Sequence, residues 1–196
     1  NFKNFLIPET VTSIGLNAFD GCINLIENEN GVVYLDNWVV GCNSNIISAN
    51  LRDGITGISN HAFYECTALT KIIIPNSIRN IGVAAFMYCN NLIDINIPEG
   101  VKSIEASLFY GCTNLETIYI PDSIISIGEG AFGYCNNLVN ITLPDNIVSI
   151  GESAFRECTQ LLTIEIPSKV IKIENYTFMD CYNLNTVVLP NGIVSI

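Results

Sequence analysis

The sequence of 196 residues has little charge, and basic side chains are especially scarce. Lys and Arg together number 8 against 19 Asp and Glu, which gives a formal net charge of −11. Nucleic acids and anionic membrane surfaces are bound mainly through Lys and Arg, so this balance argues against either as a partner. Hydrophobic residues still make up 49% of the chain, which is enough for a packed core and excludes intrinsic disorder.

Long hydrophobic runs are also missing. No run approaches the ~18 apolar residues that a membrane-spanning helix needs, so we expect no membrane insertion and a core buried piecewise along the chain. The segment Asn1–Phe5 lacks the basic start and apolar stretch of a signal peptide. A mature or excised fragment has the same appearance, so this does not indicate a cytosolic protein.

Three residue types recur at one interval of 23 residues, which indicates an internal repeat. Proline occurs at Pro75, Pro98, Pro121, Pro144, Pro167 and Pro190. Cysteine occurs at Cys66, Cys89, Cys112, Cys135, Cys158 and Cys181. Phenylalanine occurs at Phe63, Phe86, Phe109, Phe132, Phe155 and Phe178.

The repeating unit reads L-x-x-I-x-I-P-x-x-[IV]-x-x-I-G-x-x-A-F-x-x-C-x-x. Units start at Phe2, Leu25, Ile46, Leu69, Leu92, Leu115, Leu138, Leu161 and Leu184, which gives eight full units and a partial ninth. The unit 25–45 is irregular, because it is two residues shorter than the others and contains the only Trp. We therefore treat 1–196 as a single repeat domain.

Each unit is predicted to form one coil of a solenoid. In the unit that starts at Leu69, the alternation places Leu69, Ile72 and Ile74 on the inward side of a short parallel strand. Pro75 has no N–H and ends that strand. Because one coil cannot bury its apolar face alone, stacked coils share a continuous core. The crossover rule favours a right-handed coil.

The return path of the coil carries the other constant positions. Ile78 and Ile81 are predicted to point back into the core, and the segment 84–86 is predicted to form a short helical turn that inserts Phe86.

This pattern closely resembles the BspA-like, or Treponema-type, class of leucine-rich repeats, whose hallmark is a 23-residue unit with I-P, I-G, A-F and C. The chain departs from it in two ways. Ser59, Glu105 and Glu174 replace the glycine, so that position does not require positive φ. Arg52 replaces a proline. The resemblance implies a leucine-rich-repeat coil in a cell-surface or secreted protein, often bacterial, that binds host or matrix proteins. Fibronectin and fibrinogen are partners known in that family, and nothing in these residues selects either.

The irregular segment 27–53 is predicted to contain an inserted β-hairpin. Two β-rich runs, 32–35 and 38–40, flank Asp36 and Asn37, which suit a tight turn. Trp38 either packs against the solenoid or protrudes as an aromatic contact, and the first interpretation is the simpler one.

Cysteine is the residue type that most invites a chemical role. Seven cysteines occupy one column of equivalent positions: Cys22, Cys66, Cys89, Cys112, Cys135, Cys158 and Cys181. Parallel side chains in such a column keep Cβ atoms farther apart than a disulfide prefers, and a line of thiols does not converge on a metal. We predict a column of buried structural thiols and no metal site. The state of Cys42, outside the column, stays open.

Catalytic motifs are missing as well. The sequence has no glycine-rich phosphate loop, nucleophile elbow or calcium loop. The only histidine, His61, could serve as a general base beside Cys66, but other units fill its slot with Gly130, Ser153 or Tyr176. A tolerant slot of this kind is typically exposed. We predict no enzymatic activity, no catalytic residue and no cofactor.

The outward positions of the strands vary freely, whereas the core columns are nearly constant within this one chain. Such variation is what a binding face permits, although drift on an idle surface produces it too. An exposed apolar strip favours an interaction site. The candidate binding residues are Ile73, Ile93, Asn96, Tyr119, Val139, Thr142, Leu162, Glu165 and Val188.

We therefore predict a non-enzymatic protein-interaction module at the cell surface or outside the cell. The alternative is a rigid spacer that presents another domain of a longer surface protein. Neither end shows the polar cap that repeat proteins need for solubility. We expect either that the sequence is a piece of a longer array or that its ends self-associate, which sedimentation would distinguish.

Overall fold

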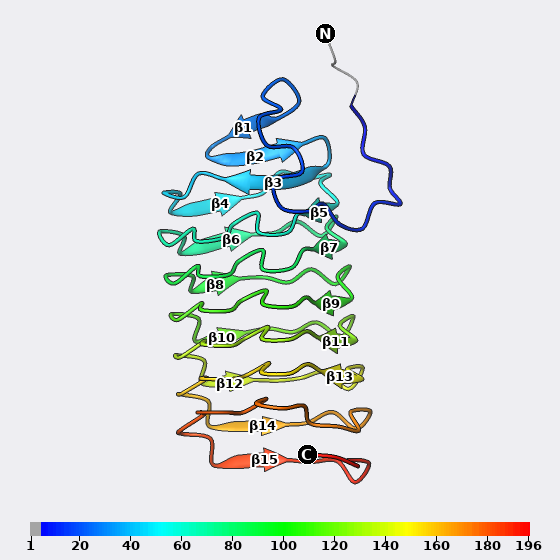
Figure 1. The fold of residues 1–196 in the computed structure, drawn as a ribbon, viewed down its shortest axis with the longest axis vertical. Helices are drawn as coiled ribbons and strands as arrows, with labels where there is room; N and C mark the ends of the chain where they lie inside the picture. Colours follow the sequence, from blue (N-terminus) through cyan, green and yellow to red (C-terminus); the bar gives the residue numbers. More distant parts are fainter. Residues whose placement is uncertain (1–4) are drawn as a thin grey trace.

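The structure is a computed structural model, and it describes residues 5–196. The chain forms one elongated stack of about seven coils with parallel strands, as predicted (Figure 1). The predicted unit start at Phe2 lies outside the described residues.

One sheet column runs along the left side of Figure 1 and contains the predicted strand of each unit from Ile46 onward. We call it the strand face. Its strands pair in parallel with their neighbours, in the orders β4-β6-β8 and β10-β12-β14-β15. They are β4 (Ser48–Asn50), β6 (Lys71–Ile73), β8 (Asp94–Ile95), β10 (Thr117–Ile118), β12 (Asn140–Ile141), β14 (Thr163–Glu165) and β15 (Thr186–Val188).

A second column of shorter strands lies on the opposite side of the coil, and the sequence did not predict it. Each strand has two residues, too few for alternation to identify. Equivalent positions pair in register, such as Ile58 with Ile81. The strands are β5 (Gly57–Ile58), β7 (Asn80–Ile81), β9 (Ser103–Ile104), β11 (Ser126–Ile127) and β13 (Ser149–Ile150).

The core lies between the two columns and matches the predicted inward positions. Leu69, Ile72 and Ile74 are buried, and so are Ile78 and Ile81. Phenylalanine rings stack from coil to coil with their planes within 19° of parallel. The stack comprises Phe63, Phe86, Phe109, Phe132, Phe155 and Phe178, with centroids 5.2 to 5.9 Å apart.

The prediction of a short helical turn at 84–86 is wrong, since residues 5–196 form no helix. Ala84 and Tyr88 have φ of 53° and 60°, in the left-handed region, which a right-handed helix does not admit. The N–H groups of Ala84, Phe86 and Tyr88 instead donate to carbonyls of the next coil. We call these stacked turns, at 59–66, 82–89 and each equivalent segment to 174–181, the turn edge.

The glycine of the I-G pair is confirmed not to require positive φ. Gly128 lies outside the left-handed region, but a Cβ there would come 2.5 Å from the backbone nitrogen of Ala106. Close approach between coils, rather than backbone conformation, therefore favours glycine at this position.

The irregular unit forms the predicted hairpin. Strands β1 (Glu27–Glu29), β2 (Val32–Leu35) and β3 (Trp38–Cys42) are antiparallel, and β3 joins the second column beside β5. Trp38 is only 1% exposed, so the packed interpretation is confirmed and the protruding contact is wrong. Arg52, which replaces a proline, donates to the carbonyl of Asp36 and pairs with Glu27 at 2.7 Å, and so holds the hairpin to the solenoid.

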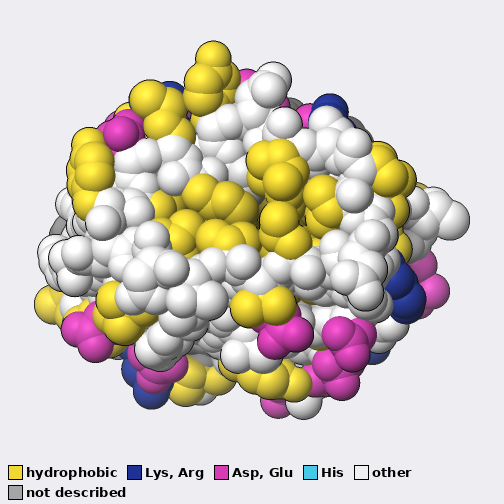
Figure 2. All heavy atoms as spheres, turned by 90° about the horizontal axis from the view of Figure 1, so that it is seen from below, with side chains coloured by type: hydrophobic (Ala, Val, Ile, Leu, Met, Phe, Trp, Pro, Cys, Tyr) yellow, Lys and Arg dark blue, Asp and Glu magenta, His cyan; other side chains and the backbone are white. Residues whose placement is uncertain are grey.

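The C-terminal end of the stack leaves core side chains uncovered. Figure 2 looks onto this end and shows hydrophobic side chains gathered at its centre, with charged side chains around the rim. Val187 is 37% exposed, whereas its partner one coil earlier, Ile164, is 2% exposed. The predicted end-to-end association stays a prediction.

Candidate functional site

The strand face presents the predicted outward side chains to solvent. Eight of the nine candidate residues are exposed: Ile73, Ile93, Asn96, Tyr119, Thr142, Leu162, Glu165 and Val188. The ninth, Val139, is half-buried. Strand alternation explains the exposure of those that flank a buried strand residue, such as Ile73 beside Ile72 and Asn96 beside Ile95. The structure thus brings the candidate residues onto one side of the stack.

Asn96 has a structural role within that face. Its Oδ1 accepts from the backbone N–H of Ile74 at 2.9 Å, and its Nδ2 donates to the carbonyl of Ile74 at 2.8 Å. The side-chain amide therefore continues the sheet where the strand has ended. Both of its polar atoms are engaged, so Asn96 is less available to a partner than its exposure indicates.

Tyr119 is the most exposed large side chain at the centre of the strand face, with 66% of its surface accessible. The negative charge of Glu99 is the main cause that raises the pKa of the Tyr119 hydroxyl, and Asp122 adds to it. A shallow depression of about 440 Å³ lies beside the ring and includes Asn140 and Thr142. A neighbouring depression of about 740 Å³ continues toward β15 and includes Glu165.

The N-terminal part of the strand face carries a charged pair. Lys71 on β6 and Asp94 on β8 approach within 2.6 Å, from positions that the sheet register places opposite each other. Both side chains are more than half exposed, so the pair adds little to stability. Among residues 5–196, no basic side chain forms an ion pair at the centre of the strand face, around Tyr119.

Six of the seven predicted column members are free thiols, of which Cys22 and Cys181 are only partly buried, and the seventh, Cys66, is not a thiol. The sulfurs of Cys42 and Cys66 are bonded, which links the hairpin to the first regular coil. Cys66 is therefore half of a disulfide rather than a free thiol. Its partner is Cys42, whose state the sequence left open. Spacing alone does not indicate this pair, because Cys42 lies one position before the column slot at Asn43. The free thiols are Cys22, Cys89, Cys112, Cys135, Cys158 and Cys181.

The free thiols contribute a hydrogen bond as well as apolar volume. The Cys112 S–H donates to the carbonyl of Phe86, 26 residues earlier, at 3.2 Å. Cys89, Cys135, Cys158 and Cys181 make the same bond to the phenylalanine of the preceding coil, at 3.0 to 3.2 Å. The carbonyl of Phe86 also accepts the backbone N–H of Cys89 at 3.1 Å, so the thiol is its second donor, one that an alanine in the column could not supply.

Burial makes these thiols weak acids. Desolvation raises the pKa of the Cys89 thiol to about 12 and that of the partly buried Cys181 to about 11. It raises the pKa of Cys112, Cys135 and Cys158 well above the usual value. Because the thiolate is the reactive form, these groups are inert rather than nucleophilic.

Thiol labelling should follow burial. With iodoacetamide at pH 8, we expect the half-buried Cys22 to react first and Cys181 slowly, with Cys112 and its buried neighbours protected until denaturation. Cys42 and Cys66 should react only after reduction. Mass spectrometry of digested samples reads each site, and a Cys22→Ser variant provides the control. Rapid labelling of Cys112 in the folded protein would contradict the arrangement.

His61 lies in the turn edge and does not form a catalytic pair with Cys66, whose sulfur is bonded to Cys42. The His61 ring instead packs edge-to-face against Tyr64 at 5.6 Å. Within 5–196, no group of three or more His, Cys, Asp or Glu side chains is placed to hold a metal ion. The same residues include no helix long and apolar enough to cross a membrane.

A ladder of tyrosines on the turn edge escaped the sequence analysis. Tyr64, Tyr88, Tyr110 and Tyr134 contact one another in sequence at 5.1 to 6.0 Å. They alternate between two adjacent columns, so each column repeats every 46 residues, which is twice the 23-residue period of the unit. Glycine makes room for the rings, since a Cβ at Gly111 would lie 2.5 Å from the ring of Tyr88.

Comparison with known proteins agrees with the architecture. The family model for the BspA type leucine rich repeat region matches residues 1–116 and 102–196, with six copies. The solved structure of a Treponema pallidum leucine-rich repeat protein, TpLRR, is similar at 32% identity and a TM-score of 0.75, over 79% of this chain and 75% of that one.

A leucine-rich repeat protein from Bacteroides ovatus is similar at 27% identity and a TM-score of 0.63, over 85% of this chain. The matched region spans about half of that protein, 51% of its chain. No curated protein sequence matches. The family model covers the whole chain, and its unit is the coil that the structure shows, so the chain belongs to the BspA-type leucine-rich repeat family.

Proposed function

We propose that the strand face binds another protein and that the chain is a non-enzymatic adhesion module of a cell-surface or secreted protein. The observation that carries the proposal is the row of exposed apolar side chains around Tyr119. Repeat solenoids commonly use such extended surfaces for recognition, and membership of a leucine-rich repeat family supports the assignment to protein interaction. Host or matrix proteins are the partners that we propose.

The physical case rests on what the fold leaves unconstrained. Tyr119, Ile93 and Leu162 gain nothing from the core, because they point away from it and are 40 to 66% exposed. Exposed aromatic and apolar side chains grouped in this way are typical anchors of an interface. The depressions beside Tyr119 offer room for partner side chains.

A double substitution tests the proposal. Tyr119→Asp with Val139→Asp places two charges at the centre of the face and should weaken binding about tenfold or more, because loss of one aromatic anchor alone costs ~2 kcal/mol. Binding would be measured by surface plasmon resonance against a panel of extracellular-matrix and serum proteins. Circular dichroism should show an unchanged fold.

A matched control lies elsewhere on the same chain. Tyr176→Asp with Val148→Asp makes the same two changes at side chains that are 58% and 51% exposed but lie off the strand face. This variant should bind like the unmodified protein. Equal loss in both variants, or saturable binding that survives in the first, would rule out the strand face as the binding site.

The alternative function is a rigid spacer that holds another domain away from a surface. The continuous stack of coils in Figure 1 suits that role as well. A spacer tolerates the Tyr119 and Val139 substitutions and binds no member of the panel. The same experiment therefore distinguishes the two functions.

A further inference from the structure

The irregular unit lacks part of the turn edge. In the first regular coil, Cys66 follows the second-column residue Ile58 by eight positions. In the irregular unit, Val39 pairs with Ile58 and is its equivalent. Asn43 is the equivalent of Cys66, because each lies three residues before the start of the next unit. Asn43 follows Val39 by only four positions, so four residues of the turn are missing there.

The turns on both sides of this gap are intact. Asn17 and Gly21 have φ of 57° and 75°, and their counterparts two units later, His61 and Glu65, have φ of 58° and 55°. The segments 15–22 and 59–66 therefore have the same turn conformation. Between them no turn from the irregular unit intervenes.

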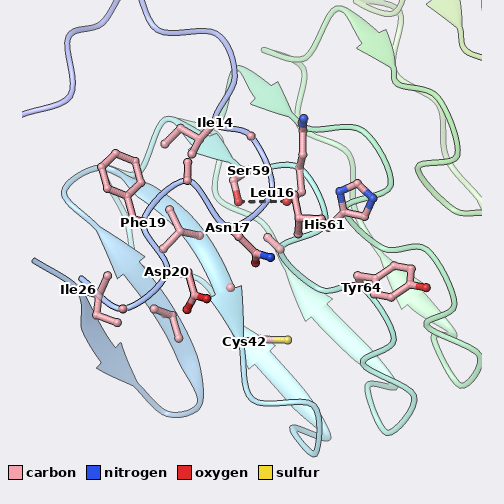
Figure 3. Close-up of a pocket in the computed structure, with 18 of the residues that line it drawn as sticks. Ile14, Leu16, Asn17, Phe19, Asp20, Ile26, Cys42, Ser59, His61 and Tyr64 are labelled. Carbon is pink, nitrogen blue, oxygen red and sulfur yellow. Dashed lines mark hydrogen bonds between the residues drawn. The ribbon is translucent and has the colours of Figure 1, made fainter. Parts of the chain in front are cut away.

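A pocket of about 320 Å³ occupies the gap, within the range of ligand sites (~300–1,000 Å³). Figure 3 shows Leu16, Asn17 and Phe19 on one side and His61 and Tyr64 on the other. Other apolar side chains of the wall are Val33, Val40 and Ala62. We call this pocket the turn slot.

Unpaired backbone donors form one side of the turn slot. In regular coils, three N–H groups of each turn donate to the next coil, as His61 does to the carbonyl of Val83 at 3.0 Å and Phe63 does to Ala85 at 2.8 Å. The equivalent N–H groups of the first turn have no acceptor anywhere in 5–196. They belong to Asn17, Phe19 and Gly21.

Unpaired acceptors form the other side. The carbonyls of Ala62 and Tyr64 receive no donor from the described part of the chain, and that of Asn60 receives only the Ser59 hydroxyl, at 3.4 Å. In the next coil the equivalent carbonyls, those of Val83, Ala85 and Met87, each accept an N–H. The turn slot thus lies between a row of donors and a row of acceptors, and at one end the N–H of Asn60 closes it by donating to the carbonyl of Ile14 at 3.0 Å.

We propose that the turn slot binds a short peptide segment of a partner protein, whose backbone replaces the missing turn. The carbonyls of the segment accept from Asn17, Phe19 and Gly21, and its N–H groups donate to the carbonyls opposite. This is recognition by backbone pairing, with the apolar walls selecting an uncharged segment that carries an aromatic or aliphatic side chain. The site is separate from the strand face and does not depend on the function proposed for it.

The chain itself supplies a matched probe. The regular turn at 82–88 reads GVAAFMY, and a capped peptide of this sequence carries the donors and acceptors in the required order. Titrated into the ¹⁵N-labelled protein, it should shift the amide resonances of Asn17, Phe19 and Gly21 and slow their hydrogen exchange at least about tenfold, as new backbone bonds form.

Methylation of one peptide nitrogen gives the sharpest control. In a regular coil the N–H of Phe86 donates to the carbonyl of Leu108 in the next coil. The carbonyl of its neighbour Ala85 accepts the N–H of Phe63 in the preceding coil. A peptide N-methylated at the position of Phe86 keeps its side chains but loses a donor to the turn slot. It should not bind, and equal binding of the two peptides would overturn the proposal.

A pair of protein variants locates the site. Leu16 lines the turn slot and Ile171 does not, yet both are 58% exposed. Leu16→Asp should abolish the amide shifts, and Ile171→Asp should leave them unchanged. Absence of shifts with the unmodified protein at millimolar peptide, or shifts unaffected by Leu16→Asp, would mean that the slot holds only solvent.

Discussion

Raising the pH from 8 to 10.5 is expected to unfold the solenoid. Burial raises the pKa of Cys89 to about 12 and that of Cys112, Cys135 and Cys158 well above the usual value, whereas an unfolded thiol ionises near ~8.5. Above that pH the unfolded chain has lost protons that the folded chain retains, so stability falls as pH rises. Each thiol contributes about 1.4 kcal/mol per pH unit, so four together lower the free energy of unfolding by about 5.6 kcal/mol per unit, or about 11 kcal/mol between pH 8.5 and 10.5.

Such a loss is comparable to the whole stability of a domain, which is commonly ~5–15 kcal/mol. The midpoint of guanidinium denaturation, followed by circular dichroism under anaerobic conditions, should decrease steeply above pH 9. The matched control replaces the same four cysteines with alanine. This variant has tyrosines that ionise as before, so a midpoint that still fell as steeply would show that the thiols are not the cause.

Phe109→Ala should be the most damaging single core substitution. The ring is fully buried and stacks on Phe86 at 5.8 Å and on Phe132 at 5.5 Å, so its removal opens a cavity bounded by two coils. We expect a loss of about 3–5 kcal/mol in the free energy of unfolding, measured by chemical denaturation. Since neighbouring coils stabilise each other, the loss should reduce the cooperativity of the whole stack.

Phe178 provides the comparison within the same column. It is half-buried and stacks on one ring only, Phe155, at 5.9 Å. Phe178→Ala should therefore cost clearly less than Phe109→Ala. Equal losses would mean that stacking between coils does not determine the stability of the column.

Much of the fold could be predicted because the same pattern of apolar residues and proline occurs in one unit after another. The positions of Leu69, Ile72 and Ile74 stay apolar from unit to unit, and Pro75 ends the strand, so the inward side could be predicted from the repeat. The turn was not, because the conformations of Ala84 and Tyr88 depend on carbonyls contributed by the next coil, 22 residues later. Local propensity favoured a helix there, and bonds between coils override it.

The candidate surfaces, too, could be predicted only in part from the sequence. The exposure of Tyr119 and Ile73 followed from strand alternation and is confirmed. The bond between Cys42 and Cys66 could not be read from spacing, because it depends on the path of the hairpin. The turn slot could not be predicted from the sequence, because it lies where a turn segment is missing. The turns on its two sides, 15–22 and 59–66, are far apart in the sequence and come together only in the folded chain.

The hydrogen-bond pairing along the turn edge gives that edge an electrical polarity. In each coil, three N–H groups of the turn donate to three carbonyls of the next coil. These bonds continue from the N–H of His61 to the N–H of Glu157. Aligned peptide dipoles add, as they do along an α-helix, but here they come from three parallel chains of hydrogen bonds that cross between coils. The positive pole lies at Tyr176–Asp180 and the negative pole at the first regular turn. Two such molecules that approach along this edge therefore attract head to tail and repel head to head.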